Sequence, residues 1–384
     1  MRSARTTVKG PALAVTAAAL ALIVSLGGCS LEKMAITKVA GMLSGPSSSA
    51  DVFSSDNDPD FVGEALPFAI KLYESLLASL PDHAGLRLRT GSLYIMYANA
   101  FVETPADMTP RREAETKEHL LARAKNLYLR GRDMLFVAVE KKNPAIRRQL
   151  KERRYAEAMV PFGKGDADLL YWTALGWLAA FSVDPFDMTL GQTVPQTRAM
   201  IERVEALVPD YGHGSLDSFY VGYYGSLPGY LGGDPAKARE HFAKAQALAG
   251  KSNTSSLMAL ATTVSVSEQN VSEFKELLGR VLAFDPESSP ENRLINILNQ
   301  RKARWLLDHI DDFFIEPGLF IRTPGFSVRH KDPRSAFLPF GQADPAASAS
   351  LQRVRSTRST ASPFDASHLQ PPRLVNNPGE PERP

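Results

Sequence analysis

The sequence has a single cysteine, Cys29, in 384 residues, and almost no excess of charge of either sign. One cysteine excludes an internal disulfide, so the fold has to be held by its apolar core. The 44 Lys and Arg residues nearly cancel the 42 Asp and Glu residues, which leaves +2 at pH 7. This balance disfavours nucleic acid as a partner, because phosphate binding needs a clustered basic surface. After residue 28 no apolar run approaches the ~20 residues of a membrane-spanning helix.

Catalytic and metal-binding patterns are also missing. Asp56, Asp58 and Asp60 have the alternate spacing of a calcium loop, but Phe61 and Pro67 stand where such a loop needs glycine and glutamate. We therefore interpret the three acids as helix-capping residues. The 7 histidines include no pair spaced by three residues, and no nucleophile has a recognisable base. We expect no enzyme activity, no metal and no cofactor.

The first 28 residues have the pattern of an export signal. Three basic residues are followed by an uncharged apolar stretch at 11–26, which ends in Leu26-Gly27-Gly28-Cys29. A branched apolar residue, two small residues and a cysteine form the lipobox of bacterial lipoproteins. We predict cleavage before Cys29 and acylation of its thiol, since each buried methylene contributes about 0.8 kcal/mol to anchoring. The alternatives are an ordinary cleaved signal and an uncleaved anchor helix, although the apolar run is short for a span.

The residue after the cysteine bears on location. Ser30 stands where an aspartate would resemble an inner-membrane retention signal, so the outer membrane, facing the periplasm, is favoured. The predicted organisation is then a lipidated linker at 29–58, a helical domain at 59–315 and a Pro/Ser-rich, largely disordered tail at 316–384. The alternative for the tail is an extended segment that packs back on the domain through its phenylalanines.

A recurring helix pattern dominates the region 59–315. A small residue is followed four positions later by a large one, three later by an apolar one and five later by proline, which keeps the side chains on one helix face and ends the helix. This is the pattern of the second helix of a tetratricopeptide hairpin. The matches that begin at Ala69, Thr197 and Phe274 include the final proline, the last of them with bulkier residues. The match at Ala238 ends in Gly250, and the match at Ala124 has no terminator.

These matches predict an all-α, tetratricopeptide-like array of helical hairpins (an α-solenoid), with partner helices at 86–101, 168–181, 216–224 and 291–314. The steps from 197 to 238 and 274 are close to the ~34 residues of the repeat, whereas those from 69 to 124 and 197 are much longer and require insertions. Residues 262–266 form the main β-like alternating run. The alternative is a helical bundle without repeats.

Aromatic residues are the main prediction for a ligand site, because Tyr and Trp combine apolar area with a polar tip. For any one of them, packing in the core is the simpler interpretation. The crowding of Phe219 with three tyrosines predicts that part of this group faces a groove or a partner. The predicted ligand-binding residues are Tyr94, Tyr97, Tyr171, Trp172, Tyr220, Tyr223 and Tyr224.

Four stretches resemble the T component of TRAP transporters, the TatT family of tetratricopeptide lipoproteins. They are EALPFAIKLYESLLASLPDH at 64–83, LYWTALGW at 170–177, YLGGDPAKAREHFAKA at 230–245, and Asp285 with PENRLIN at 290–296 and QRKARWLL at 300–307. With the lipobox, the resemblance covers about residues 29 to 314.

The resemblance implies an accessory envelope lipoprotein of a TRAP-type (tripartite ATP-independent periplasmic) uptake system. It implies binding to a periplasmic solute-binding protein, capture or transfer of an organic acid or a hydrophobic small molecule, and self-association as a trimer. The alternative function is a tetratricopeptide scaffold for envelope assembly proteins.

Overall fold

The computed structural model describes residues 34, 36–43 and 49–315, and these contain helices but no strand. The predicted all-α class is therefore confirmed, while the leader, Cys29 and the Pro-rich tail lie outside the described residues. The longer helices are α3 (Pro59–Ser79), α4 (Ala84–Ala98), α6 (Ala114–Lys142), α9 (Ala167–Ser182), α11 (Val194–Leu207), α12 (Ser215–Ser226), α13 (Pro235–Ala249), α15 (Val271–Ala283) and α16 (Arg293–Asp308). The shorter ones are α2 (Ser49–Ser54), α5 (Thr104–Asp107), α7 (Ile146–Lys151), α8 (Tyr155–Met159), α10 (Met188–Gly191) and α14 (Ser255–Leu260).

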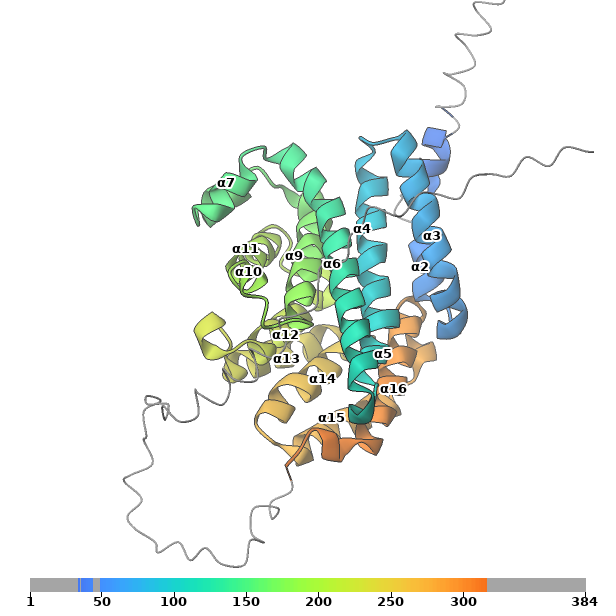
Figure 1. Ribbon diagram of the computed structural model, residues 1–384, viewed down its shortest axis with the longest axis vertical. Helices are drawn as coiled ribbons and strands as arrows, with labels where there is room; N and C mark the ends of the chain where they lie inside the picture. Colours follow the sequence, from blue (N-terminus) through green and yellow to red (C-terminus); the bar gives the residue numbers. More distant parts are fainter. Residues whose placement is uncertain (1–33, 35, 44–48, 316–384) are drawn as a thin grey trace, which may run out of the picture. The chain divides into compact units, whose positions relative to one another are not determined.

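Helices that follow one another in the chain pack side by side (Figure 1). The chain runs from α3 through α4, α6 and α9 to α11, and then from α12 through α13, α14 and α15 to α16. The last helix also contacts α2 and α3, so the end of the described chain returns to its beginning. The tetratricopeptide geometry of the individual helix pairs stays a prediction.

The residues of the recurring pattern lie on the buried faces of their helices. Phe274, Leu278 and Val281 on α15 are 0% exposed, and the corresponding residues of α11 are buried as well. On α13, Ala238 and Ala245 are buried and Phe242 is half-buried. The prolines of the pattern follow the helix ends, as Pro209 does after α11. The spacing therefore identified which side of each helix faces the core, and that burial is the main source of stability in a chain without disulfides.

Small residues allow close helix approach at the centre of the domain. Gly91 on α4 and Gly131 on α6 face each other, and a Cβ added at Gly131 would lie 2.8 Å from the carbonyl oxygen of Gly91. A Cβ added at Gly176 on α9 would lie 2.6 Å from Cδ1 of Ile95. A side chain at Gly131 would push α4 and α6 apart, whereas one at Gly176 would displace the Ile95 side chain.

The long steps in the pattern are filled by extra helices. Helices α7 and α8 lie between α6 and α9, and α10 lies between α9 and α11. The predicted insertions are therefore short helices, and α7 projects beside the ends of the long helices in Figure 1.

The β-like run at 262–266 is helical, contrary to its alternating pattern. It coincides with η6 (Ala261–Ser265), a π-helical turn that follows α14. The hydroxyls of Thr262 and Thr263 donate to carbonyl oxygens four residues earlier, at 2.8 and 2.6 Å. These hydrogen bonds give both threonine hydroxyls an acceptor inside the helix, although threonine is β-branched. A second π-helical turn, η1 (Asn99–Glu103), joins α4 to α5.

The predicted final helix at 291–314 is shorter than expected. Residues 290–292 form the 3₁₀ turn η8 (Pro290–Asn292), α16 ends at Asp308, and residues 310–312 form a second 3₁₀ turn. The chain leaves the helix at His309, where φ is −119° and ψ is 29°. The ring of Phe314 then packs 5.0 Å from that of Phe274. The half-buried Phe314 side chain thus packs on the core beyond the end of the helix.

The described helices include none that is both long and apolar enough to cross a membrane.

Candidate functional site

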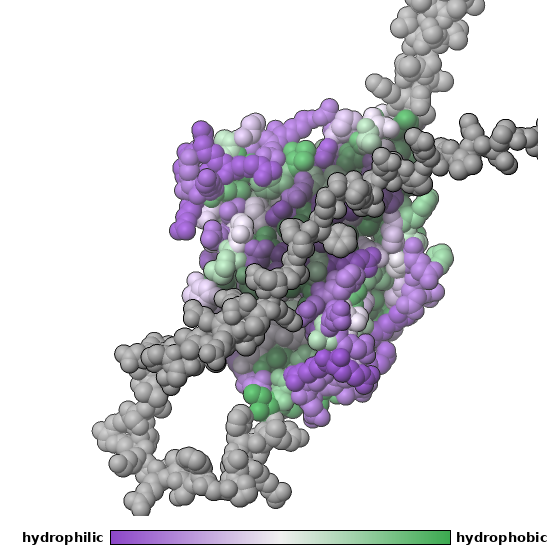
Figure 2. Space-filling view, in the orientation of Figure 1, coloured by the Kyte–Doolittle hydropathy of each residue, from purple (hydrophilic) through white to green (hydrophobic). Residues whose placement is uncertain are grey.

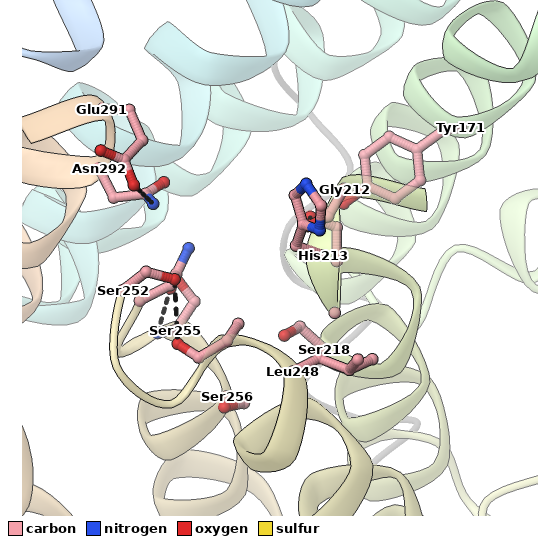
Figure 3. A pocket seen from close by; sticks show the side chains of 14 residues that line it. Tyr171, Gly212, His213, Ser218, Leu248, Ser252, Ser255, Ser256, Glu291 and Asn292 are labelled. Atoms are coloured by element: carbon pink, nitrogen blue, oxygen red, sulfur yellow. Dashed lines mark hydrogen bonds between the residues drawn. The ribbon is translucent and has the colours of Figure 1, made fainter. Parts of the chain in front are cut away.

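A cavity of about 460 Å³ opens between the middle and the end of the described chain (Figure 3). Its wall combines α9, the turn before α12, the end of α13, the start of α14 and η8, so elements far apart in sequence contribute to it. The lining residues are Tyr171, Gly212, His213, Gly214, Ser215, Ser218, Leu248, Ala249, Ser252, Asn253, Ser255, Ser256, Glu291 and Asn292. This volume is in the range of pockets that hold small molecules.

One wall of the cavity is a turn with a left-handed backbone. Gly212, His213 and Gly214 have φ values of 59°, 46° and 99°. Glycine adopts this conformation without strain, whereas a residue with a side chain rarely does. The turn joins α11 to α12 and places the His213 side chain in the cavity wall. The sequence pattern alone did not identify His213 as a site residue.

The opposite wall is held by amide side chains. Oδ1 of Asn296 accepts hydrogen bonds from the backbone N–H and the hydroxyl of Thr254, at 3.0 and 2.9 Å. Nδ2 of Asn299 donates to the same Thr254 hydroxyl at 3.0 Å. Thr254 and Asn296 are 0% exposed, so this network is shielded from water. It fixes the segment 252–256, whose serines and Asn253 line the cavity, before any ligand arrives.

The residues that line the cavity are mostly polar, and few of them are charged. Hydroxyl and amide groups dominate, none of the lining residues is Lys or Arg, and Glu291 is the only carboxylate. A hydrogen bond from the Ser289 hydroxyl lowers the pKa of Glu291, so this group is ionised at neutral pH. The cavity can therefore make many hydrogen bonds, but it offers a carboxylate ligand no fixed cation.

Tyr171 is the predicted ligand residue that lies in this cavity wall (Figure 3). Its ring centroid lies 4.9 Å from that of Tyr211 and 5.8 Å from that of Trp172. Burial raises the pKa of Tyr171 to about 12, so its hydroxyl stays protonated and can donate. Trp172 supports the Tyr171 ring from the side without lining the cavity.

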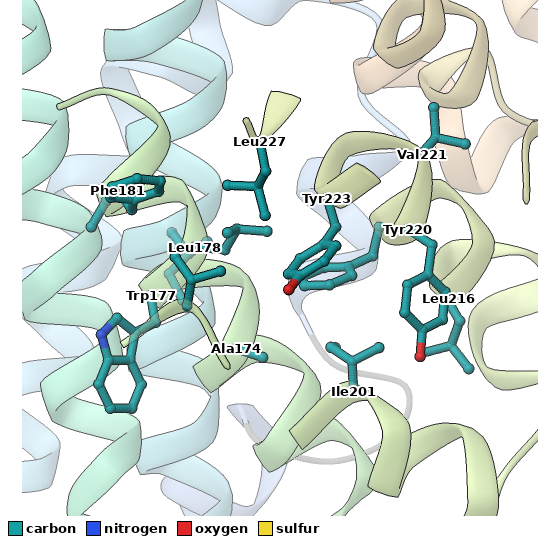
Figure 4. Packing of buried hydrophobic residues seen from close by; sticks show 14 of the residues in the cluster. Ala174, Trp177, Leu178, Phe181, Ile201, Leu216, Tyr220, Val221, Tyr223 and Leu227 are labelled. Atoms are coloured by element: carbon teal, nitrogen blue, oxygen red, sulfur yellow. The ribbon is translucent and has the colours of Figure 1, made fainter. Parts of the chain in front are cut away.

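Tyr220, Tyr223 and Tyr224 lie away from the cavity, in the core. They are 4%, 2% and 7% exposed, and Phe219 beside them is also buried. The prediction that part of this group faces a groove is wrong for the described residues, because α12 packs against α9, α13 and α14. Figure 4 shows Tyr223 directed toward Leu178, with Tyr220 farther along the same helix. A ligand-binding role for these tyrosines stays a prediction.

The polar end of Tyr220 is satisfied within the protein. Its hydroxyl donates to Oε2 of Glu205 at 2.9 Å, and its ring stacks 4.4 Å from the ring of His241. Nδ1 of His241 in turn lies 2.8 Å from Oδ1 of Asp217. Burial and the hydrogen bond to Glu205 raise the pKa of Tyr220 above its ordinary value. These contacts join α11, α12 and α13.

Tyr94 and Tyr97 contribute to the packing of α4 against its neighbours. The Tyr94 hydroxyl donates to Oε1 of Glu74 at 2.7 Å, and the Arg130 guanidinium lies 4.8 Å from the Tyr94 ring centroid. Arg123 donates to the half-buried Tyr97 hydroxyl at 3.2 Å. Neither tyrosine lines the cavity, and their predicted ligand-binding role stays a prediction.

A second polar cluster lies where α16 meets η1 and α5. Glu103 accepts hydrogen bonds from the Tyr128 hydroxyl and from Nδ2 of Asn99, while Nζ of Lys302 lies 2.6 Å from Oδ2 of Asp107. Burial and the like charge of Asp107 raise the pKa of Glu103. Burial alone would lower the pKa of Lys302, but the two carboxylates outweigh it and raise that pKa. The cluster links the last long helix to the first half of the domain.

No group of metal-ligating side chains occurs among residues 34, 36–43 and 49–315.

These features define a helical protein with a polar cavity between the middle and the end of the described chain. The profile of a family described as "TRAP transporter T-component" matches residues 55–314, which include every residue of the cavity wall. A protein of Treponema pallidum (strain Nichols), described as uncharacterized, is 35% identical over 322 residues, covering 80% of this chain and 100% of that protein. The chain belongs to the TRAP transporter T-component family. It has an accessory role in TRAP transport, in the periplasm or envelope and in association with other TRAP components.

Proposed function

We propose that the chain is an acylated envelope lipoprotein that binds the periplasmic solute-binding protein of a TRAP system and exchanges a small solute with it through the cavity. Membership of the T-component family supports the partner. The observation that carries the proposal is the cavity itself, because the wall formed by residues 252–256 is fixed in advance by the Asn296 and Asn299 network. A preformed wall reduces the ordering cost of binding.

The lining favours one kind of solute over the others. A purely hydrophobic molecule would leave the hydroxyl and amide groups of the wall without partners, which costs about 1–3 kcal/mol for each buried group. A strongly anionic molecule would meet the ionised Glu291 and no lysine or arginine. A polar organic solute with several hydrogen-bonding groups and little net negative charge fits this lining best.

The anchor is proposed to be the acylated Cys29, at the end of Leu26-Gly27-Gly28. Two or three acyl chains are sufficient for stable membrane attachment. Ser30 supports the outer membrane as the location, with the domain facing the periplasm.

Self-association, as a trimer, is proposed through an exposed stripe on α3. Phe61, Phe68 and Leu72 are 64%, 74% and 43% exposed, and their spacing places them on one face of the helix. Exposed aromatic residues that line up in this way are typical of protein interfaces.

The test is purification of the tagged chain from its native envelope after reversible cross-linking. The proposal predicts recovery of a TRAP solute-binding protein and an intact mass that includes acyl chains. The variant Cys29→Ala should appear in the aqueous fraction and lack the acyl mass. Recovery of envelope assembly proteins without a solute-binding protein would support the scaffold function instead.

A further inference from the structure

The inserted helices α7 and α8, together with the residues on either side of them, carry a cluster of positive charge. Residues 141–164 contain eight Lys and Arg residues and two glutamates, in a chain whose net charge is +2. Figure 2 shows hydrophilic side chains covering the region of α7. The eight cations are Lys141, Lys142, Arg147, Arg148, Lys151, Arg153, Arg154 and Lys164.

Half of these cations are paired within the protein. Lys141 lies 2.8 Å from Asp82, Lys142 lies 3.2 Å from Asp166, and Arg147 and Arg154 pair with glutamates. The other four are exposed and form no ion pair with any residue that the structure describes. They are Arg148, Lys151, Arg153 and Lys164. We call these four the basic platform.

The hairpin of α7 and α8, which carries Arg148, Lys151 and Arg153 of the basic platform, is rigidly held. Nδ2 of Asn143 donates to Oε1 of Gln149 at 2.8 Å and to the carbonyl oxygen of Ala158 at 2.9 Å. Asn143 and Gln149 are 5% and 7% exposed, so these bonds are shielded from water. Apolar residues from both short helices, including Ile146 at 0% exposure, join the main core. The cations therefore project from a fixed surface and not from a fraying loop.

The basic platform lies at the same end of the domain as the start of the described chain. The carbonyl oxygen of Leu43 accepts a hydrogen bond from Tyr73 at 3.0 Å, in the last third of α3. The turn that follows α3 carries Asp82, which pairs with Lys141 at the end of α6. Figure 1 places α7 and the turn between α3 and α4 at one end of the domain.

The proposed anchor fixes how far this end can be from a bilayer. Cys29 precedes Met34, the first described residue, by five positions. Five residues span at most about 18 Å when fully extended. The end of the domain that holds the basic platform is therefore kept close to lipid headgroups whenever Cys29 is acylated.

We propose that the basic platform binds the phosphate groups of anionic phospholipids in the leaflet that holds the anchor. The proposal rests on the proposed lipoprotein anchor for the position of the bilayer. Clustered Lys and Arg beside a membrane attachment point are attracted to anionic headgroups, and the attraction is lost within a Debye length of the surface. Val160, which is 70% exposed on the same hairpin, adds an apolar contact at the interface. The contact orients the domain on the membrane as well as strengthening its attachment.

The experiment uses the mature chain from residue 29 with Cys29→Ser, so that no acyl chain contributes to binding. Co-sedimentation is measured with vesicles of phosphatidylcholine alone and of phosphatidylcholine mixed with phosphatidylglycerol. The expected result is binding only to the mixed vesicles, weakening as salt is added. The triple variant Arg148→Gln/Lys151→Gln/Arg153→Asn should bind at least about tenfold more weakly. Asparagine is chosen at position 153 because φ there is 59°.

A matched control removes three exposed lysines from the α13–α15 region, by Lys244→Gln, Lys251→Gln and Lys275→Gln. It lowers the net charge equally and should bind as the unmodified chain does. The variant Arg148→Lys/Arg153→Lys, which keeps the charge, should also bind. Equal loss in both triple variants would contradict the proposal, and so would equal binding to both kinds of vesicle.

A protein partner is the competing occupant. Absence of vesicle binding, together with loss of the solute-binding protein in the triple variant, would overturn the membrane proposal and assign the surface to that partner. Because the chain carries no acyl group here, failure of this experiment is separate from failure of the proposed lipidation, which the intact mass reports.

Discussion

The close contact of α4 with α6 gives a sharp test of how the helices pack. The substitution Gly131→Ala adds one methyl group, whose carbon would lie 2.8 Å from the Gly91 carbonyl oxygen and 2.8 Å from Cγ1 of Ile95. The Ile95 side chain can rotate, but the backbone oxygen can move only if α4 moves. Gly279→Ala on α15 is the matched control, because a Cβ there meets nothing within 4 Å.

Both substitutions change the free energy of unfolding through helix propensity, but only one of them adds overpacking strain. Both replace glycine inside a helix, which stabilises the folded state by about 1 kcal/mol through helix propensity. Only Gly131→Ala adds the strain of overpacking, typically about 1–3 kcal/mol. We therefore expect Gly279→Ala to be more stable than the unmodified chain by about 1 kcal/mol. Gly131→Ala should be less stable than Gly279→Ala by about 1–3 kcal/mol.

The assay is equilibrium unfolding in urea, followed by helical circular dichroism at constant temperature. The slope of the transition should be the same for all three proteins, since each exposes the same surface on unfolding. Equal stability of Gly131→Ala and Gly279→Ala would refute the close packing of α4 on α6.

Three further predictions concern charge, assembly and a buried hydroxyl. The pKa of Glu103 is raised by burial and by Asp107 above the ordinary 4.5, so the folded chain holds this proton more tightly than the unfolded chain. The free energy of unfolding should therefore decrease as the pH rises above 4.5. Urea unfolding at several pH values should show a smaller decrease for Glu103→Gln than for the unmodified chain. Phe68→Asp should give a monomer in native mass spectrometry with unchanged unfolding, because Phe68 is 74% exposed; a persisting trimer would count against the α3 stripe. Tyr220→Phe should cost about 1 kcal/mol in urea unfolding through loss of the bond to Glu205, and no loss would contradict that bond.

Much of the fold could be predicted from the sequence, because burial follows helical periodicity. The residues spaced by four and three on α11 and α15 are buried, and prolines mark where those helices end. The end of α16 was missed, since the pattern of its residues does not reveal that Phe314 packs back on Phe274. The alternating run at 262–266 is helical, because its local propensity gives way to the helices on both sides.

The site was harder to predict than the fold. Tyr171 lies in the cavity wall, but crowding of tyrosines on α12 did not indicate exposure, because neighbouring helices enclose that helix on several sides. His213, Asn253 and Glu291 were not identified, since residues far apart in the sequence meet only through tertiary packing. The two glycines that flank His213 were the only sequence feature that pointed to an unusual turn at this position. Likewise, a net charge of +2 conceals the basic platform.

The central claim is that the cavity opens toward a TRAP solute-binding protein. Leu248 lines the cavity and is 53% exposed, whereas Val137 on α6 is 47% exposed and lies outside the cavity wall. A photo-reactive amino acid placed at each position in turn, followed by irradiation of intact cells, tests the claim directly. We predict a cross-link to the solute-binding protein from position 248 and not from position 137. A cross-link from position 137 alone, or capture of other envelope proteins from position 248, would contradict it.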